Sequence, residues 1–370
     1  MTELLVGTKK GLFLLEGEPG FGFEIKTRAF AGQPVDFATH DPRSGRLLAT
    51  VTSPFYGPKI FYTDGDPAGE WEQADGVSLP DGGDHALERI WVIVRGEADG
   101  TLYAGGDPGV LFESHDGGAG WEINAGLWEQ PSRPHWQPGG GGLCVHSICT
   151  WPGDPAKLAV AVSAAGIWLT DDAGRTWRRG NEGLNPRYLP AEALRDENAG
   201  RCVHHVERAP RQPERMFMQF HGGVYRSDDA GESWIDIGGG GLPSDFGFPL
   251  MVDPADPDSA YVIPLAADMD RVTPEGRVRV HETRDAGSTW VARGEGLPVE
   301  HAYLTVLRQA FSRAGEGERL ELYFGATSGD LFGSGDAGAT WSTVATRLPP
   351  VLSLVAIPGH TSPSGRSVPR

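Results

Sequence analysis

The sequence predicts an all-β protein built from one unit that is repeated along the chain. Its 370 residues include 53 Gly, 29 Pro and 11 Trp, a composition typical of many short strands joined by turns. A phrase of the form S/T-x-D-x-G, closed by a Trp, recurs at intervals of 51 to 57 residues. Because repeat folds grow by adding units to one structure, the length of the chain does not require several domains.

The repeated phrase has five clear copies and one degenerate copy. The clear copies are FESHDGGAGW, WLTDDAGRTW, YRSDDAGESW, HETRDAGSTW and FGSGDAGATW, and the degenerate copy is YTDGDPAGEW. A period near 50 residues is the size of one four-stranded propeller blade. Within each unit the phrase falls between the third and fourth expected strands, so we expect it to form the hairpin that joins them.

The two ends of the chain predict how the ring of blades closes. The first 30 residues contain only three expected strands, whereas the strand VLSLVAI at Val351–Ile357 follows the last phrase without a partner. Pairing this C-terminal strand with the first blade would leave no open sheet edge. The sequence therefore predicts a single seven-bladed β-propeller of four-stranded antiparallel blades over residues 1–358, followed by a flexible C-terminal tail at residues 359–370.

The repeated phrase resembles the Asp-box, or BNR, motif of sialidase-like and related β-propellers, and the resemblance extends over nearly the whole chain. An aspartate in this position can accept backbone N–H bonds inside a tight hairpin. A catalytic aspartate would be needed once or twice, not in every repeat, so we interpret these residues as structural. They are Asp116, Asp172, Asp229, Asp285 and Asp336.

Charge and composition narrow the classes of partner. The net charge of −18 argues against binding to a nucleic-acid backbone, which depends on Lys and Arg. The N-terminus lacks the pattern of an export signal, no apolar run reaches the roughly 18 residues of a membrane span, and the three cysteines do not indicate a disulfide framework. We expect a cytoplasmic protein without nucleic-acid or membrane partners.

Candidate ligand-binding residues are expected on the face opposite the repeated hairpins, where long loops converge on the mouth of the central channel. Aligning the first strands of consecutive blades places Asp36, Arg89, His146 and His204 at one height near this mouth. The histidines and Arg89 would make the mouth locally positive, which favours an anionic or polar ligand. Alternatively, these groups only hydrogen-bond to the channel wall. The full ligand-binding set is Asp36, His85, Arg89, Trp136, His146, His204, His205 and Tyr303.

Two related tetrapeptides raise the alternative of a metal site. CVHS begins at Cys144 and CVHH begins at Cys202, and in each the Cys and His are two residues apart, on the same side of a strand. Two Cys and two His form the donor set of a zinc site, here Cys144, His146, Cys202 and His204. The other interpretation is that both cysteines are small core residues, with no cofactor bound.

The resemblance leaves the activity open, because Asp-box propellers include glycoside hydrolases, sorting receptors and assembly factors. The arginine triad and R-I-P motif of sialidases are not recognisable, and Arg89 and Arg308 are expected at unequal heights. Another glycosidase would need two carboxylates across the mouth, for which Asp36 and Glu88 are candidates. The chain is thus predicted to bind a polar small-molecule or glycan-like ligand, with or without hydrolysis. The alternative is a non-catalytic propeller that binds or scaffolds a protein partner.

Overall fold

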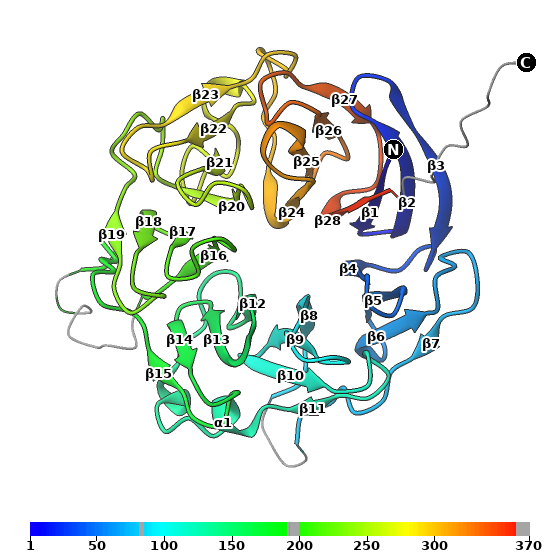
Figure 1. Ribbon diagram of the computed structural model, residues 1–370, viewed down its shortest axis with the longest axis vertical. Helices are drawn as coiled ribbons and strands as arrows, with labels where there is room; N and C mark the ends of the chain where they lie inside the picture. The colour runs from blue at the N-terminus through cyan, green and yellow to red at the C-terminus, as the bar shows by residue number, and fades with distance from the viewer. Residues whose placement is uncertain (81–84, 191, 193–199, 360–370) are drawn as a thin grey trace, which may run out of the picture.

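Antiparallel sheets surround a central axis, with their strands succeeding one another from the centre outward (Figure 1). The computed structural model describes residues 1–80, 85–190, 192 and 200–359, so all but the first residue of the predicted C-terminal tail lies outside the described residues. The helices in this part of the chain are short: α1 (Ala125–Trp128), η1 (Arg133–His135), η3 (Pro274–Gly276) and η4 (Gly317–Arg319). None of them has the length or apolar character needed to cross a membrane.

Five of the sheets contain four strands each, and in each the strands follow chain order. The first two sheets are β4 (Val35–Asp41), β5 (Arg46–Ser53), β6 (Gly57–Thr63) and β7 (Glu72–Gln73), then β8 (Arg89–Arg95), β9 (Leu102–Asp107), β10 (Val110–Ser114) and β11 (Glu122–Ile123). The third is β12 (Val145–Trp151), β13 (Asp154–Val162), β14 (Gly166–Thr170) and β15 (Arg178–Arg179). The fourth is β16 (Val203–Arg208), β17 (Met216–Phe220), β18 (Gly223–Ser227) and β19 (Ile235–Asp236). The fifth is β20 (Gly247–Val252), β21 (Ala260–Pro264), β22 (Val280–Thr283) and β23 (Val291–Arg293).

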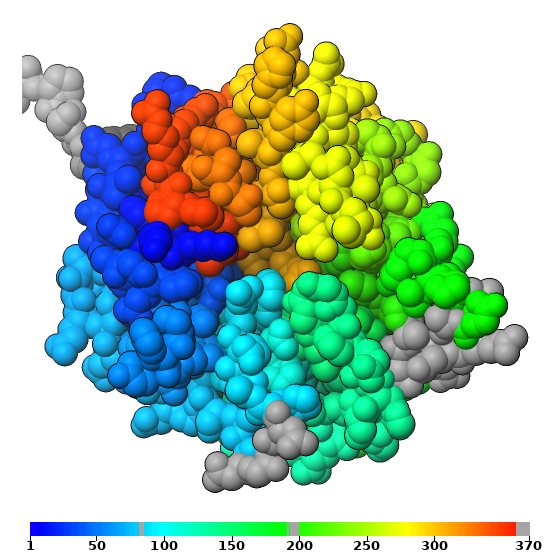
Figure 2. Space-filling model, turned by 180° about the vertical axis from the view of Figure 1, so that it is seen from behind, coloured from blue at the N-terminus to red at the C-terminus, as the bar shows by residue number. Residues whose placement is uncertain are grey.

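The remaining sheet has eight strands and contains both ends of the chain. It joins β24 (Val306–Ala314), β25 (Glu321–Ala326), β26 (Leu331–Ser334) and β27 (Ser342–Ala345) to β28 (Val351–Pro358), β1 (Thr2–Thr8), β2 (Gly11–Glu18) and β3 (Gly22–Ala29). A single parallel bridge, Gln309 to Ser353, links the two groups of four. The C-terminal strand β28 pairs antiparallel with β1 from Thr2↔Pro358 to Thr8↔Val351, as the sequence predicts. Figure 2 shows the N-terminal and C-terminal segments side by side in blue and red.

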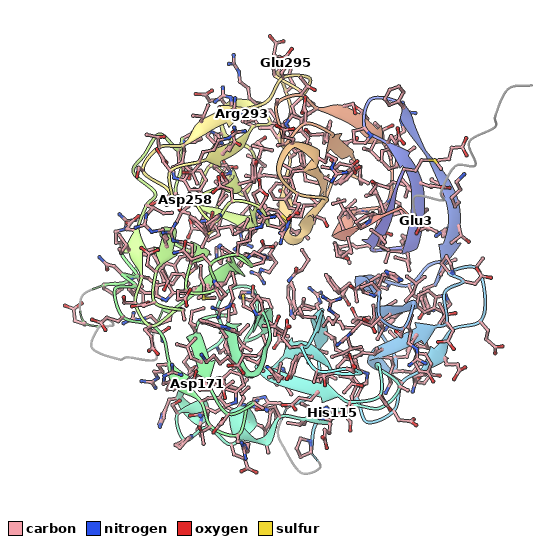
Figure 3. All side chains as sticks on the ribbon, in the orientation of Figure 1. Glu3, His115, Asp171, Asp258, Arg293 and Glu295 are labelled. Carbon is pink, nitrogen blue, oxygen red and sulfur yellow. The ribbon has the colours of Figure 1, made fainter. Side chains whose placement is uncertain are left out.

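The hydrophobic core lies between neighbouring sheets. Several middle strands are mostly apolar, because neighbouring sheets cover both of their faces; β14 and β17 are buried at every residue. Large rings such as Phe112, Tyr225 and Phe324 are fully buried there. Charged side chains of the outer strands and hairpins, such as the labelled Asp171 and Arg293, lie toward the periphery (Figure 3).

The repeated phrase forms the hairpin between the third and fourth strands, as its position in the unit predicts. In the copy between β18 and β19, Asp229 Oδ1 accepts hydrogen bonds from the Ser227 hydroxyl at 2.8 Å and from the Ser233 backbone N–H at 2.9 Å. The Ser227 hydroxyl oxygen in turn accepts the N–H of Gly231, whose φ of 98° suits glycine. Partial burial would raise the pKa of Asp229, but these bonds outweigh it and lower that pKa.

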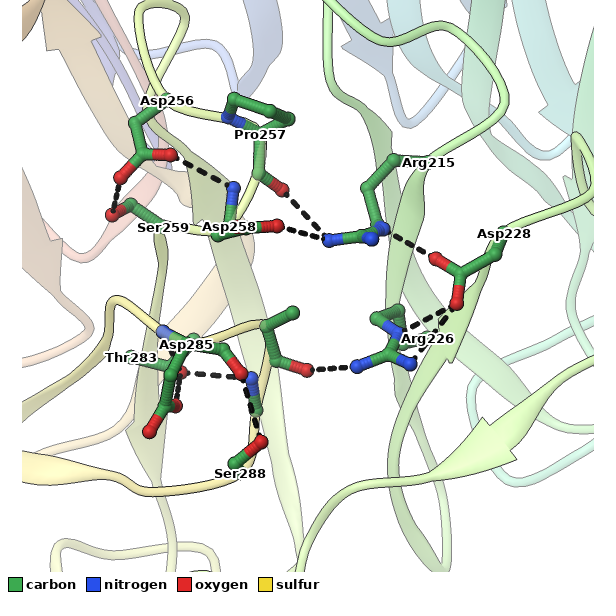
Figure 4. A network of polar contacts seen from close by, with 12 residues as sticks. Arg215, Arg226, Asp228, Asp256, Pro257, Asp258, Ser259, Thr283, Asp285 and Ser288 are labelled. Atoms are coloured by element: carbon green, nitrogen blue, oxygen red, sulfur yellow. Dashed lines mark hydrogen bonds and ion pairs between the residues drawn. The ribbon is translucent and has the colours of Figure 1, made fainter.

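The hairpins also connect each sheet to the next. The backbone N–H of Trp234 donates to Glu182 O at 2.9 Å, and its indole Nε1–H donates to Gly180 O at 2.9 Å; both carbonyls belong to the segment after β15 of the preceding sheet. On the other side, Arg226 donates to Ala286 O at 2.7 Å in the following hairpin (Figure 4). The phrase is therefore a joint between sheets.

We expect Asp229→Ala to lower the free energy of unfolding by about 1–2 kcal/mol, because the hairpin loses its shared acceptor while its N–H groups remain accessible to water. Ligand binding at the channel mouth should be unchanged. Urea denaturation of the variant measures the first effect, with Asp99→Ala, a change at a fully exposed side chain, as the control. A loss of binding without a loss of stability would contradict the structural role of the hairpin.

Candidate functional site

The innermost strands each carry a β-bulge near the mouth of the channel. The register shifts leave one residue of each strand without a partner opposite it: Asp36 in β4, Trp91 in β8, His146 in β12 and His204 in β16. A bulge bends the strand and redirects the side chain of the extra residue. The shared bulge thus places a large polar or aromatic side chain at the same level in four consecutive sheets.

This register corrects the sequence alignment at one position. Arg89 was aligned with Asp36, His146 and His204, but it pairs regularly with Asp107, and Trp91 is the equivalent residue. All four strands share the bulge, so the two-residue error arises from the spacing of the turn that follows β8 and not from the bulge. Arg89 still reaches the mouth, because its Nε lies 3.2 Å from Asp36 Oδ1.

A small cavity of about 150 Å³ lies at the mouth. It is lined by Asp36, Arg89, Trp91, Gly141, Phe248, Arg271, Leu307, Arg308, Gln309 and Leu352. The lining comes from the innermost strands of several sheets and from two loops, one between β11 and β12 that contains Gly141 and one between β21 and β22 that contains Arg271. Arg89 and Arg308, expected at unequal heights, line this one cavity.

Three arginines and two aromatic rings alternate around the cavity. The Arg89 and Arg308 guanidinium carbons lie 4.7 Å and 4.9 Å from the centroid of the Trp91 ring. Those of Arg308 and Arg271 lie 5.6 Å and 5.4 Å from the centroid of Phe248. Each ring therefore contacts two cations, which offsets part of the repulsion between them.

The charges at the mouth are only partly balanced. Asp36 is buried, which raises its pKa, and it is held by Arg89 and by the Thr52 hydroxyl, which donates at 2.5 Å. Among the described residues, no carboxylate lies within ion-pair distance of Arg308 or Arg271. Arg308 is 7% exposed; within the described part of the chain, its NH1 donates only to Cys144 Sγ at 3.8 Å, and its Nε has no partner. The buried Trp91 Nε1–H also has no acceptor in the described part of the chain.

The histidines do not supply the positive charge that the sequence suggests. Burial lowers the pKa of His146 and of His204 well below the usual value, and nearby Arg308 lowers both further. Both rings are therefore neutral near pH 7. His146 hydrogen-bonds through both nitrogens, to the Ser147 hydroxyl at 3.0 Å and to Val203 O at 2.9 Å. The positive potential of the mouth comes from its arginines.

A second cavity, of about 450 Å³, occupies the channel on the side of the repeated hairpins. His146 and His205 contribute to its lining, together with Glu207 and Arg313, which form an ion pair at 2.7 Å. Burial would raise the pKa of Glu207, but Arg313 and His205 outweigh it and lower that pKa. Gln309 lines both cavities and donates to His146 O at 2.6 Å across the channel, so it lies between them.

The other predicted ligand residues lie away from the small cavity. Trp136 is buried against Trp168, with ring centroids 5.0 Å apart, and donates to the Ser132 hydroxyl. His85, Glu88 and Tyr303 are exposed and line neither cavity.

Only part of the proposed zinc set comes together. Cys144 contacts Arg308, and both nitrogens of His146 are hydrogen-bonded to protein groups. Cys202 and His204 instead lie beside His221, with one donor atom of each residue within 4.8 Å of the others. Sequence reasoning missed His221 because it belongs to the turn after β17, 17 positions from His204 in the chain.

Trp91, Arg271 and Arg308 were also missing from the predicted ligand set. Arg271 is in the long loop 264–277, whose length was the available signal. Arg308 stands in an innermost strand, between Leu307 and Gln309, where a charged side chain is unusual. Gly141 belongs to a run of four glycines, and a side chain there would contact the Arg308 guanidinium at 3.9 Å.

Comparisons with known proteins support the fold. No protein-family model and no curated protein matches this chain. Among solved structures, it is similar to an ancestral GH74 enzyme (TM-score 0.56, 14% identity, 87% of this chain and 38% of that one). It is also similar to the Cps50 (Swd1) β-propeller domain of Myceliophteria thermophila (TM-score 0.54, 10% identity, 85% and 87%) and to YCF48 from Cyanidioschyzon merolae (TM-score 0.52, 12% identity, 84% and 84%).

These similarities establish a β-propeller fold and no more. The chain spans little more than a third of the GH74 enzyme. Because the structural neighbours include glycoside hydrolases and propellers not named as enzymes, function must be argued from the site itself.

Proposed function

We propose that this chain is a seven-bladed propeller of the Asp-box type that binds a small carboxylate ligand, such as an acidic sugar, at its channel mouth. The seven-blade count is supported by the single bridge within the eight-stranded sheet, since each half has the strand order of a separate blade. The Asp-box assignment is supported by the repeated hairpin bonds of Asp229 and its equivalents.

The buried, unpaired guanidinium of Arg308 carries the proposal. A buried charge without a partner is costly, and a bound anion would supply the missing partner. The planar donors of arginine match a carboxylate in a bidentate arrangement. Arg89 and Arg271, at the entrance to the cavity, add positive charge on a protein whose net charge is −18, so they would steer anions to this mouth.

The lining favours binding over glycoside hydrolysis. A glycosidase of the usual kind uses two carboxylates on either side of the scissile bond. Of the described residues that line the small cavity, Asp36 alone is a carboxylate, and it is already held by Arg89 and Thr52. Glu88, the other catalytic candidate, is exposed and does not line the cavity.

A protein partner is the second candidate, favoured by exposed apolar side chains on the same face. Phe55 and Tyr56, in the turn between β5 and β6, are 88% and 81% exposed, and Met269, in the loop between β21 and β22, is 92% exposed. A peptide with a free C-terminal carboxylate would combine contacts to these residues with an ion pair at Arg308.

A thermal-shift screen of matched acids and amides tests the proposal. Sugar acids and their amides are compared, and so are peptides with free and amidated C-termini. We expect acids to raise the Tm, because a ligand that binds only the native state stabilises it by mass action, while the uncharged amides leave it unchanged. Equal shifts with acids and amides, or no shift with any acid, would contradict carboxylate binding. A shift confined to the peptide acids would favour the protein partner.

A further inference from the structure

Three side chains that commonly bind metals meet within the fourth sheet, outside the small cavity. Cys202 directly precedes β16, His204 is the bulge residue of β16, and His221 lies in the turn between β17 and β18. One donor atom of each residue lies within 4.8 Å of the other two. The N–H of His221 donates to Cys202 O at 2.9 Å, so the backbone holds the two segments together.

Each histidine has a polar contact through one ring nitrogen, His204 through Nδ1 and His221 through Nε2, which leaves the other nitrogen to bind an ion. Nδ1 of His204 lies 2.6 Å from Gly247 O, so Nδ1 carries the proton and Nε2 keeps its lone pair. A carbonyl that accepts from the second nitrogen is the usual support of a metal-bound histidine. Nε2 of His221 lies 3.6 Å from Asp268 Oδ2, which brings a carboxylate to the edge of the cluster.

We propose that Cys202, His204 and His221 bind one divalent transition-metal ion of the zinc class, with Asp268 supporting His221 through its ring Nε2. Sulfur and imidazole donors favour zinc over magnesium or calcium, which prefer oxygen. Zinc bonds of ~2.0–2.3 Å place tetrahedral donors roughly 3.3–3.8 Å apart. The three donor atoms therefore need only small side-chain rotations to close on an ion.

Aromatic packing explains part of the arrangement. The His204 ring lies 4.8 Å from the Phe248 ring and 5.3 Å from the Phe246 ring, between centroids. Such packing accounts for a flat ring at position 204. The His221 ring joins the same aromatic cluster, 5.2 Å from the His204 ring and 5.3 Å from the Phe246 ring. This packing does not account for the thiol of Cys202 beside the two imidazoles. A metal ion accounts for all three.

The test loads the purified full-length protein with Zn²⁺, removes the excess and measures the metal content. We expect one ion per chain in the parent protein, and binding weakened by more than ~100-fold in Cys202→Ser and in His221→Gln, since loss of a supporting partner alone costs 10–100-fold. Cys144→Ser and His205→Gln are matched controls that should retain the ion. Co²⁺ provides a second measurement, because a thiolate-to-cobalt absorption band should appear in the parent and be absent from Cys202→Ser.

The metal measurements are independent of the thermal-shift screen, because no acid from that screen is added to the protein. Absence of stoichiometric metal in the parent, or equal loss in Cys144→Ser and Cys202→Ser, would overturn the proposed site. If Cys202→Ser does not fold, the metal content of His221→Gln tests the site instead. This variant should fold, because His221 lies in a turn and is partly exposed. Retention of the ion in His221→Gln would then refute the assignment.

Discussion

Replacing Arg308 with Met should weaken carboxylate binding by about 100-fold or more, which corresponds to ~2.7 kcal/mol, while leaving the free protein as stable as the parent or more stable. Loss of one charge-assisted, desolvated contact explains the first effect. The second follows because the free protein buries this guanidinium without a carboxylate, so removal of the charge relieves a desolvation cost. Isothermal titration with an acid from the screen, together with urea denaturation, measures both effects.

Arg313→Met is the matched control for this prediction. Arg313 is also an innermost-strand arginine, but it is paired with Glu207 at 2.7 Å and lines the larger cavity. Its removal leaves Glu207 without its cation, so we expect a loss of ~3 kcal/mol in stability and little change in carboxylate binding. A destabilised Arg308→Met that still binds the acid would instead identify Arg308 as a structural residue.

Deleting Val351–Ile357 should abolish the soluble monomer. This segment makes up most of β28, which pairs along β1 and buries Val351 and Leu354 in the core. Without it, β1 becomes an open edge with unpaired backbone groups and exposed apolar side chains, which promotes aggregation. Size-exclusion chromatography and the yield of soluble protein measure the effect.

A truncation after residue 359 is the control for that deletion. It removes the segment predicted as a tail and keeps β28 whole, so the Tm should equal that of the parent. A monomeric protein with an unchanged Tm after loss of Val351–Ile357 would show that β28 does not close the structure.

The sequence predicts the fold well because the fold repeats. Each copy of the phrase marks one hairpin, and the surplus strand at Val351–Ile357 pairs with β1 as expected. These features are local in the chain, or follow from counting strands. No comparable regularity marks the bulges of the innermost strands, and one inserted residue shifts every side chain after it to the other face.

The candidate site was only partly predictable, because the turns used for alignment differ in length from sheet to sheet. The alignment by turns placed Arg89 at the position that Trp91 occupies, and it assigned His146 to the mouth, although both of its nitrogens bond within the channel wall. Arg271 and His221 reach their sites from a loop and a turn, so their positions depend on how sheets pack. The sequence predicts that many polar side chains lie at the channel mouth, but it does not predict which of them contact one another.

The role of Arg308 in carboxylate recognition is tested most directly by the affinity of one acid and its matched amide for both the parent protein and Arg308→Met. These four values form a cycle that isolates the interaction between the ligand carboxylate and Arg308. We expect the parent to prefer the acid by about 100-fold and Arg308→Met to bind acid and amide almost equally. If Arg308→Met retained the full preference for the acid, the carboxylate would be bound elsewhere, and Arg308 would not be the residue that recognises it.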